Sequence, residues 1–477
     1  MGLDLQKMAK LSCGIDFGTT NSSVAVSDGA TARVLDIDLE NDSPTLLPSL
    51  LYIARDGERI VGRAAANTFI ERNVDREVIV RHIDLGVHIE GYVGGEGDNT
   101  YGSVPRKEGL DVHEAVTARA LVEVNSPGRL FQSLKTSLRL KEFRGTEVFG
   151  THYQIEELTA EILRRIKAAV DEEAGEPIDS AVFGRPVHFS TREDEDIVAE
   201  RRLKTAAHLA GFKNVTFLYE PVGACVEYAI SREYTQRLMV VDIGGGTFDV
   251  CIMEFGGSHG RASRLAESRI LGVAGVPVAG DAIDREITRE KIFPCFGSQA
   301  RYGPAMLPLP QFLFNTVLDW QNLYKLNTEE TINWLIAAQV SSDQPKAIRA
   351  LRALIQRNYG YPLAREVETA KKALSTELET AIEFCEPDIE INERLERSEF
   401  KHIIEHMLEK MMKALEDAEK AAGLGPEEID RVLTTGGTSL IPAVREMLTD
   451  RYGREKLEQR DTFTSVATGL AIVAQYA

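Results

Sequence analysis

Two short segments that lie far apart in the chain share one unusual design. Residues 14–26 read GIDFGTTNSSVAV, and residues 239–253 read MVVDIGGGTFDVCIM. In each, an apolar strand runs into an aspartate, then into a turn of glycine and threonine, and then into a second apolar strand. Glycine weakens a strand unless another backbone or a ligand must approach it closely. This sparse internal repeat predicts two related lobes, each of which opens with its own hairpin.

The first turn has the chemistry of an anion site. Its glycine lets several main-chain N–H groups point at one anion, and Thr19, Thr20 and Asn21 add side-chain donors. Asp16 would repel a phosphate unless a divalent cation lay between them, as Mg²⁺ held through water does. A capped hairpin with no ligand explains this turn equally well, because such turns are common.

The second turn favours a polyphosphate site over a plain hairpin. Asp242 and Asp249 surround three consecutive glycines and Thr247, a combination that a plain hairpin does not need. A third element, LTTGGTSLIP at 433–442, again runs from a strand through two glycines into a helix. Alone, this third element is more typical of an ordinary turn from strand to helix.

The segments around these turns alternate between helix and strand. Apolar spacing predicts helices over Ile155–Ala174 and from 190 to 211, with strands at Ala181–Phe183 and Val215–Leu218. Near the C-terminus we expect one helix from Ser398 to Ala422, a strand at 432–434 and a helix at 442–448. Two regions interrupt this order: 84–109, rich in glycine and acid and expected to be an exposed insertion, and 297–364, expected to be a helical elaboration.

Composition limits the partners of the chain. The 477 residues carry a formal net charge of −19, which disfavours a general nucleic-acid surface or an anionic membrane surface. No stretch reaches the roughly 20 apolar residues of a membrane span. The five cysteines form no CxxC pair, so we expect buried thiols and a cytoplasmic protein.

Taken in order along the chain, these elements resemble a known family. The two hairpins, YEPVGACVEYA at 219–229, AKKALS at 370–375 and LTTGGTSLIP are similar to the nucleotide-binding domain of DnaK-type heat-shock chaperones. These chaperones belong to the actin, hexokinase and chaperone ATPase superfamily, and the chain looks most like YegD-type proteins. The resemblance implies the α/β, actin-like ATPase fold, with duplicated ribonuclease-H-like cores around a nucleotide cleft. It implies lobe I at 1–235, lobe II at 236–454 and a helix at 455–477 that returns to lobe I.

The resemblance also assigns roles to residues of this sequence. It implies ATP or ADP and Mg²⁺ as ligands, with Asp16 and Asp242 holding the metal through water. Pro186 matches the proline of an interdomain relay, although it is equally typical of a strand end. The catalytic group implied is Lys135, Glu220, Asp242 and Thr247. The nucleotide-binding group implied is Gly18, Thr19, Thr20, Asn21, Gly244, Gly245, Gly246, Glu368, Lys371, Lys372, Ser375, Gly436 and Gly437.

Some positions depart from the family pattern or offer another motif. The family's Gly-Gly-Glu-Asp is Ala279-Gly280-Asp281-Ala282 here, and an arginine of the third element is Leu440; both changes bear on nucleotide affinity. The stretch 402–406 (HIIEH) matches a zinc-protease motif. The surrounding residues show no third ligand, so we interpret it as the solvated face of an amphipathic helix.

The resulting hypothesis is a slow ATPase that is chaperone-like and whose lobes close on nucleotide. A small-molecule kinase of the same superfamily and a non-catalytic, nucleotide-switched scaffold remain alternatives. Because the chain ends at Ala477, we expect it to lack the family's peptide-binding β-sandwich and to work through a protein partner or co-chaperone on lobe II.

Overall fold

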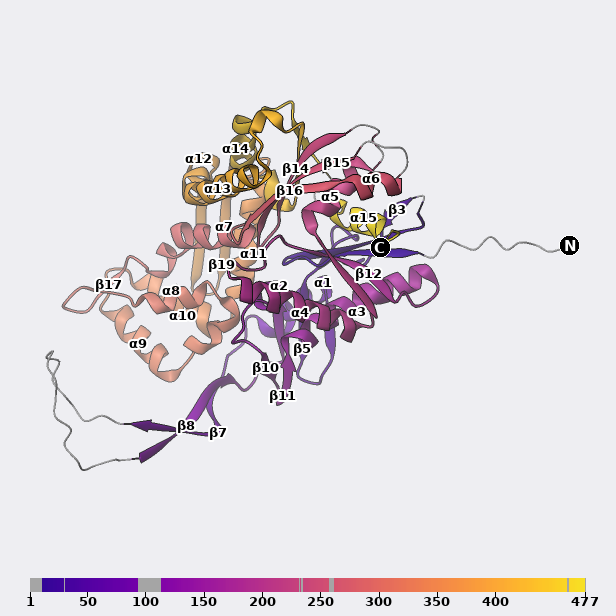
Figure 1. Ribbon diagram of the computed structural model, residues 1–477. Coiled ribbons are helices and arrows are strands. Elements are labelled where there is room, and N and C mark those ends of the chain that lie inside the picture. The colour runs from indigo at the N-terminus through magenta and orange to yellow at the C-terminus, as the bar shows by residue number, and fades with distance from the viewer. Residues whose placement is uncertain are drawn as a thin grey trace, which may run out of the picture.

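The two large sheets of the protein share one strand order. The computed structural model describes residues 11–29, 31–92, 113–230, 232, 235–256, 261–460 and 463–476. In each large sheet the first two strands form an antiparallel hairpin, and the last two strands run parallel to the first (Figure 1). The first sheet has the order β13 (Asn214–Tyr219), β12 (Ser180–Arg185), β1 (Ser12–Asp16), β2 (Asn21–Ser27), β3 (Ala32–Val34). It has one additional strand, β4 (Leu47–Pro48), which pairs antiparallel with β2. The second has the order β22 (Leu457–Gln459), β21 (Arg431–Thr435), β14 (Gln236–Ile243), β15 (Phe248–Phe255), β16 (Arg269–Val276).

Amphipathic helices cover the outer faces of both sheets. α3 (Ile155–Ala174) has the bounds that its apolar spacing predicts, buries Leu158, Ile162 and Ile166, and ends at the left-handed residue Gly175. α4 (Glu193–Ala210) packs beside it, and four acidic residues open its first turn, where they favour the helix dipole. On the second sheet, α13 (Glu405–Ala422) packs against β15 and β16.

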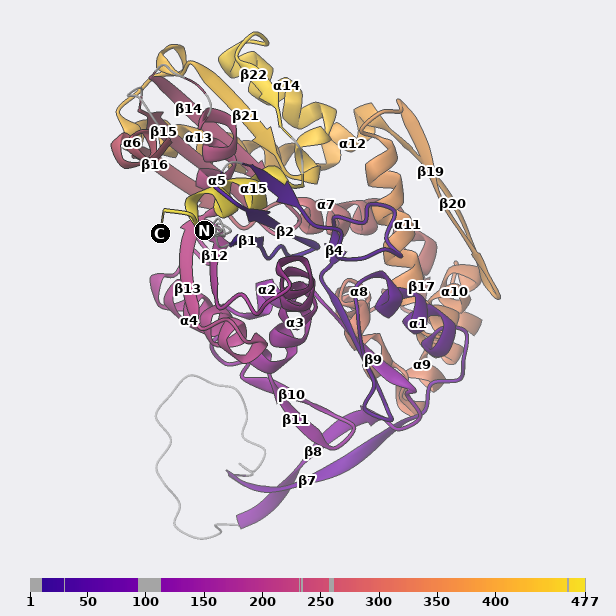
Figure 2. The same ribbon diagram turned by 90° about the vertical axis from the view of Figure 1, so that its right-hand side faces the viewer.

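Two helices occupy the space between the sheets. Figure 2 shows α5 (Glu220–Ala229) and α15 (Ser465–Val473) side by side, with the second sheet on one side and the first on the other. Their apolar side chains join residues of both sheets, such as Val182 and Val240, in one buried cluster. The helices cross closely because Gly223 meets Gly469, where a Cβ atom on Gly469 would overlap the Gly223 carbonyl. One hydrophobic core therefore joins both sheets at the floor of the cleft.

A smaller sheet extends the first lobe. β5 (Leu50–Ala54), β6 (Arg59–Val61) and β9 (Gly128–Gln132) form it, and α1 (Arg63–Asn73) packs on it. Residues 84–92 of the expected insertion belong to β7 (Val80–Tyr92), which pairs with β8 (His113–Glu123) in a ribbon; residues 93–109 lie outside the described part. The remaining elements on this side are α2 (Leu134–Ser137), β10 (Gly145–Val148) and β11 (Thr151–Gln154).

The segment 297–364 is helical, as its pattern predicts. It holds α8 (Gln311–Val317), a 3₁₀ helix at Trp320–Leu326, α9 (Glu329–Val340), α10 (Pro345–Gln356) and the first residues of α11 (Gly360–Ala373). A short hairpin of β17 (Arg301–Tyr302) and β18 (Leu307–Pro308) precedes them. The other elements of this half are α6 (Arg261–Glu267), α7 (Gly280–Ile287), β19 (Glu379–Glu386), β20 (Ile389–Glu396), α12 (Arg397–Ile403) and α14 (Pro442–Tyr452).

Three expectations from the sequence need correction. The single helix expected from Ser398 to Ala422 is two helices, α12 and α13, that meet at Ile404. The two histidines of the motif at 402–406 therefore lie on different helices, His402 on α12 and His406 on α13. The side chain of His402 is 86% exposed. Cys385 is exposed, whereas Cys13, Cys225 and Cys251 are buried thiols.

The expected boundary between the lobes disagrees with the pairing of one strand. β22 lies within 455–477, the segment assigned to lobe I, yet it pairs with β21 of the second sheet. Only α15, the later part of that segment, packs on the first sheet. Among the helices of the described ranges, none is both long enough and apolar enough to cross a bilayer.

The crossing of α5 and α15 yields a stability prediction. We expect Gly469→Ala to lower the free energy of unfolding by at least about 2 kcal/mol, because the new methyl group forces the helices apart. Thr468→Ala, at the neighbouring half-buried position, is the control and should cost much less. Urea unfolding followed by circular dichroism measures both; equal effects would contradict the close-packing argument.

Candidate functional site

Every site residue that the sequence predicts lines one cavity. The cavity has a volume of about 730 Å³ and lies between the two hairpin turns, α7, α11 and the turn after β21. Both lobes therefore contribute to it. The predicted residues in its wall are Asp16, Gly18, Thr19, Thr20, Asn21, Lys135, Glu220, Asp242, Gly244, Gly245, Gly246, Thr247, Glu368, Lys371, Lys372, Ser375, Gly436 and Gly437.

The two hairpin turns approach each other directly. A Cβ atom on Gly246 would lie 2.7 Å from Oγ1 of Thr19, and one on Gly245 would overlap Oγ1 of Thr20. No side chain fits between these turns, which explains why the second turn consists of glycines. Both turns therefore present backbone to the same part of the cavity.

A buried ion pair lies at the floor of the cavity. Ser133, in the left-handed conformation with φ of 56°, precedes the one-turn helix α2 and directs Lys135 inwards. Nζ of Lys135 lies 2.7 Å from Oε1 of Glu220, and less than a tenth of either side chain is exposed. Burial alone would lower the pKa of Lys135, but Glu220 and Asp16 outweigh that effect and raise it, so the ammonium group stays charged.

The carboxylates around this pair outnumber the lysine. Burial and the charge of Glu220 raise the pKa of Asp16 to about 7, against the opposing effect of Lys135. Burial also raises the pKa of Asp242 well above its usual value, with Glu220, Asp16 and Asp249 adding to the effect. In the described residues no three Asp, Glu, His or Cys side chains converge closely enough to hold a metal directly. A buried excess of carboxylates over cations suits a divalent cation.

The residues on α11 form ion pairs along the opposite wall. Nζ of Lys371 lies 2.6 Å from Oδ2 of Asp284 and donates to the carbonyl of Gly280. Lys372 pairs with Glu368 at 2.7 Å, one turn earlier on the same helix, and stays largely exposed. Lys371 is thus held against α7, whereas Lys372 and Glu368 face the cavity from the helix surface.

Sequence reasoning missed part of the wall. Asp284 and Arg285 on α7 line the cavity, as do Trp320, Tyr361 and Phe463. Asp284 had a detectable signal, since it lies on the face of α7 that also carries Asp281. The three aromatic residues had none, because each belongs to a segment whose position depends on tertiary packing.

The segment after β12 connects the lobes beneath the cavity. The backbone N–H of Val187 donates to Oδ1 of Asp249 at 2.8 Å, and both groups are buried. Burial and the charge of Glu220 raise the pKa of Asp249 to about 7. Pro186, which precedes Val187, lies at this junction and does not line the cavity. Its relay role stays a prediction.

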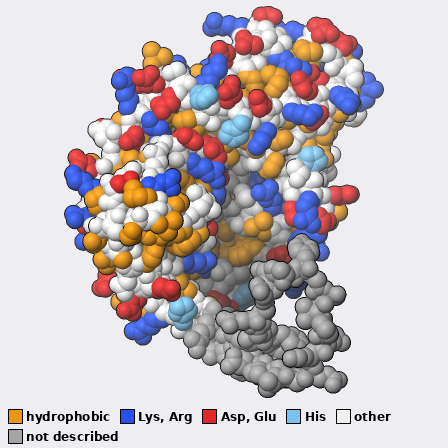
Figure 3. Space-filling view, turned by 90° about the vertical axis from the view of Figure 1, so that its left-hand side faces the viewer, with side chains coloured by type: hydrophobic (Ala, Val, Ile, Leu, Met, Phe, Trp, Pro, Cys, Tyr) orange, Lys and Arg blue, Asp and Glu red, His pale blue; other side chains and the backbone are white. Residues whose placement is uncertain are grey.

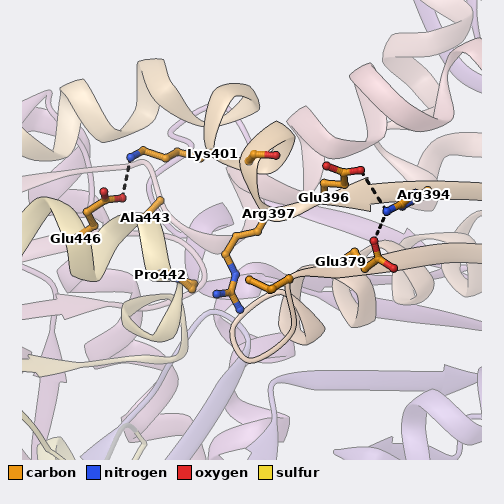
Figure 4. Close-up of a pocket in the computed structure, with 10 residues that line it drawn as sticks. Glu379, Arg394, Glu396, Arg397, Lys401, Pro442, Ala443 and Glu446 are labelled. Carbon is orange, nitrogen blue, oxygen red and sulfur yellow. Dashed lines mark hydrogen bonds and ion pairs between the residues drawn. The ribbon is translucent and has the colours of Figure 1, made fainter.

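A second cavity, of about 450 Å³, lies between β19, β20, α12 and α14 and is less suited to an ionic ligand. Figure 4 shows Arg394 between Glu379 and Glu396, and Lys401 paired with Glu446. Three basic and three acidic side chains line it, so its charges balance. We therefore assign the candidate site to the larger cavity between the lobes.

Comparison with known proteins identifies the family. A model of the Hsp70 protein family matches residues 12–87, 95–263 and 336–476, which is most of the chain. The chain belongs to the Hsp70 family. This membership, together with the two equivalent sheets, shows the actin-like ATPase fold that the sequence predicts.

Curated relatives of this Hsp70-family chain are DnaK chaperones. It is 26% identical over 475 residues to "Chaperone protein DnaK" of Thermus thermophilus, covering 98% of this chain and 61% of the relative. It is 25% identical over 461 residues to "Chaperone protein DnaK 1" of a Synechococcus strain, covering 97% of this chain and 49% of the relative. The chain thus spans about half to three fifths of the length of these relatives.

The buried carboxyl group of Asp281 leads to a prediction of how the stability of this Hsp70-family protein depends on pH. Burial raises its pKa to about 6, against the opposing effect of Lys371. The folded state therefore binds more protons than the unfolded state between about pH 4 and pH 6, and stability falls as the pH rises through that window. Asp281→Asn cannot ionise, so we expect it to raise the free energy of unfolding at about pH 7.5 by up to about 3 kcal/mol.

The measurement is urea unfolding without nucleotide at about pH 4 and about pH 7.5. At the lower pH the variant and the parent should agree, because Asp281 is then largely protonated. Asp56→Asn, on an exposed turn, is the control for a charge change elsewhere. An equal gain for Asp281→Asn at both pH values would show that ionisation is not its cause.

Proposed function

We propose that this chain binds ATP between its lobes and hydrolyses it slowly as a chaperone-like ATPase. The observation that carries the proposal is the meeting of both glycine turns with the Lys135–Glu220 pair in one cavity. Paired backbone turns suit the phosphates of a nucleotide, and a buried cation suits the terminal phosphate. Membership of the Hsp70 family supports the same reaction.

In the proposed reaction water attacks the terminal phosphorus in line with the departing diphosphate. Positioning and charge stabilisation supply most of the catalysis in such a transfer. Lys135 donates to the terminal phosphate oxygens, because its pKa is raised and it remains cationic in the buried floor. Glu220 and Thr247 orient the attacking water, and the two turns hold the phosphate chain through their backbone N–H groups.

Mg²⁺ fits the proposal at the carboxylate cluster. Asp16 and Asp242 would hold it through water, and it would neutralise phosphate charge. Without it, burial and the charge of Glu220 raise the pKa values of both Asp16 and Asp242, which reflects the cost of ionising these two buried carboxylates.

We propose that the remaining groups fix the adenosine. Glu368 and Lys372 on α11 and Ser375, just after that helix, line the cavity, and Gly436 with Gly437 would form the opposite wall. A small-molecule kinase would use the same nucleotide site, and its signature would be phosphate transfer to a sugar or carboxylate. A non-catalytic switch would bind nucleotide without turnover.

The proposed setting is the cytoplasm, with a protein partner on the second lobe. Exposed hydrophobic side chains gather on part of the face that the helical segment 297–364 presents (Figure 3). Those on this segment are Met306, Leu307, Phe312, Ile336 and Val340. A cluster of this kind favours a protein contact. That the chain works without the family's peptide-binding β-sandwich stays a prediction.

The first test of the proposal is nucleotide binding. Isothermal titration should show that ATP binds in the presence of Mg²⁺, and that Asp16→Asn removes most of the Mg²⁺ dependence because one of the two cluster aspartates is lost. Asp56→Asn, on the surface, should leave binding unchanged. No heat of ATP binding by folded protein would refute the proposed function.

The second test separates catalysis from binding. We expect Lys135→Ala to lower single-turnover hydrolysis at least about tenfold, roughly 1.4 kcal/mol of transition-state stabilisation, with little loss of ATP affinity. Lys141→Ala, which removes a lysine paired with Asp194 at the surface, is the matched control. Unchanged hydrolysis in Lys135→Ala would show that Lys135 takes no part in the reaction. Phosphate transfer from ATP to any of a panel of sugars or carboxylates by the parent protein would favour the kinase alternative.

A further inference from the structure

The lysine at the cavity floor lies on a helix that is too short to be stable by itself. α2 has only four residues, and a helix of one turn forms too few internal hydrogen bonds to offset the cost of its nucleation. It also follows Ser133, whose left-handed backbone is uncommon for a residue other than glycine. The position of Lys135 therefore depends on contacts between α2 and the rest of the protein.

Two leucines anchor α2 in the core of the first lobe. Leu134 and Leu138 are at most 4% exposed, and they belong to the buried cluster that also contains the apolar faces of α3 and α4. Hydrophobic burial is not directional. It holds α2 against the core without setting the direction in which Lys135 points, so directional bonds must set that direction.

A buried arginine supplies such bonds just after α2. Arg202, on α4, is 6% exposed. Its Nη1 donates to the carbonyls of Leu138 and Leu140, each at 2.9 Å, and its Nη2 donates to the carbonyl of Lys141 at 3.4 Å. Within the described part of the chain, no backbone N–H donates to the carbonyls of Leu138 and Lys141. The guanidinium group is therefore the partner that holds the turn directly behind the lysine's helix.

Arg202 is an expensive residue to place between two helices. Its Nε lies 3.6 Å from Oε1 of Glu156, at the start of α3, so a carboxylate only partly offsets its charge. An apolar side chain of similar volume often replaces a buried ion pair without loss of stability. The planar guanidinium offers instead a fixed set of donors that can bond several carbonyls at once. This geometry favours a role in orientation over a role in filling space.

We infer that Arg202 is a positioning residue, which fixes α2 so that Nζ of Lys135 stays against Glu220 at the cavity floor. Arg202 does not line the cavity, so it acts through Lys135. A displacement of a reacting group by about 1 Å can lower a rate roughly a hundredfold. This inference rests on the proposed hydrolysis, in which Lys135 donates to the terminal phosphate of ATP.

The principal test compares the saturated rate of hydrolysis with the affinity for ATP. Arg202→Met keeps a long apolar side chain and removes the guanidinium group, so kcat should fall at least about tenfold. The affinity for ATP should stay at the parent value, because both glycine turns are untouched. Arg202→Lys keeps the charge on a single nitrogen and should recover only part of the rate. Arg201→Met, at the neighbouring exposed position of α4, is the matched control and should keep the parent kcat.

A double-mutant cycle separates positioning from general support of the fold. If Arg202 acts only through Lys135, adding Arg202→Met to Lys135→Ala should not lower hydrolysis further. A residue that only supports the lobe would lower the rate by the same factor with or without the lysine, and that result would overturn the inference. Urea unfolding checks that each variant is folded, and Arg202→Lys replaces Arg202→Met in the cycle if the latter is not.

Hydrogen exchange of the nucleotide-free protein tests the positioning even if the parent does not hydrolyse ATP. In Arg202→Met, peptides that contain 133–143 should exchange faster than in the parent, while peptides of α11 and of the two hairpin turns should not change. Unchanged exchange at 133–143, or a parent-like kcat, would overturn the inference. Faster exchange at 133–143 in a protein whose parent form shows no hydrolysis would support the positioning and count against the proposed function alone.

Discussion

The packing of α5 and α15 against each other is the interaction on which the rest of the structure depends. The close meeting of Gly223 and Gly469 lets both helices fit between two sheets at once. Because this core joins the sheets at one side, the hairpin turns face each other across the cavity. The candidate site and the buried ion pair at its floor lie between the sheets that this core joins.

The chemistry of the cavity floor depends on the combined charges of several buried residues. Asp16, Asp242, Asp249 and Glu220 surround one lysine in a buried volume, and this arrangement costs free energy without a cation. A fold selected only for stability would not collect these groups. Their arrangement is typical of a site that binds a ligand whose charges complete it.

Local sequence patterns predicted those parts of the structure in which local chemistry decides the conformation. The helix over Ile155–Ala174 and the two hairpins carry their own local signals. Lys135, Glu220 and the residues at 368–375 were assigned through the family resemblance instead, and the structure brings them into one cavity with the two hairpin turns. The break at Ile404 was missed because the apolar spacing continues through it. The aromatic wall at Trp320 and Tyr361 was missed because its position depends on contacts with Phe69, far away in sequence, which no local pattern encodes.

The shared strand order of the two sheets has a consequence for how the chain can be divided. α5 follows the last strand of the first sheet and packs on β14 and β15 of the second, whereas α15 follows the last strand of the second and packs on β1 and β2 of the first. The two halves have in effect exchanged their final helices, as in a swapped dimer fused into one chain. Neither half, excised at its last strand or after its last helix, keeps the helix that completes its own core. Each lobe therefore needs a helix from the other half of the chain to complete its core.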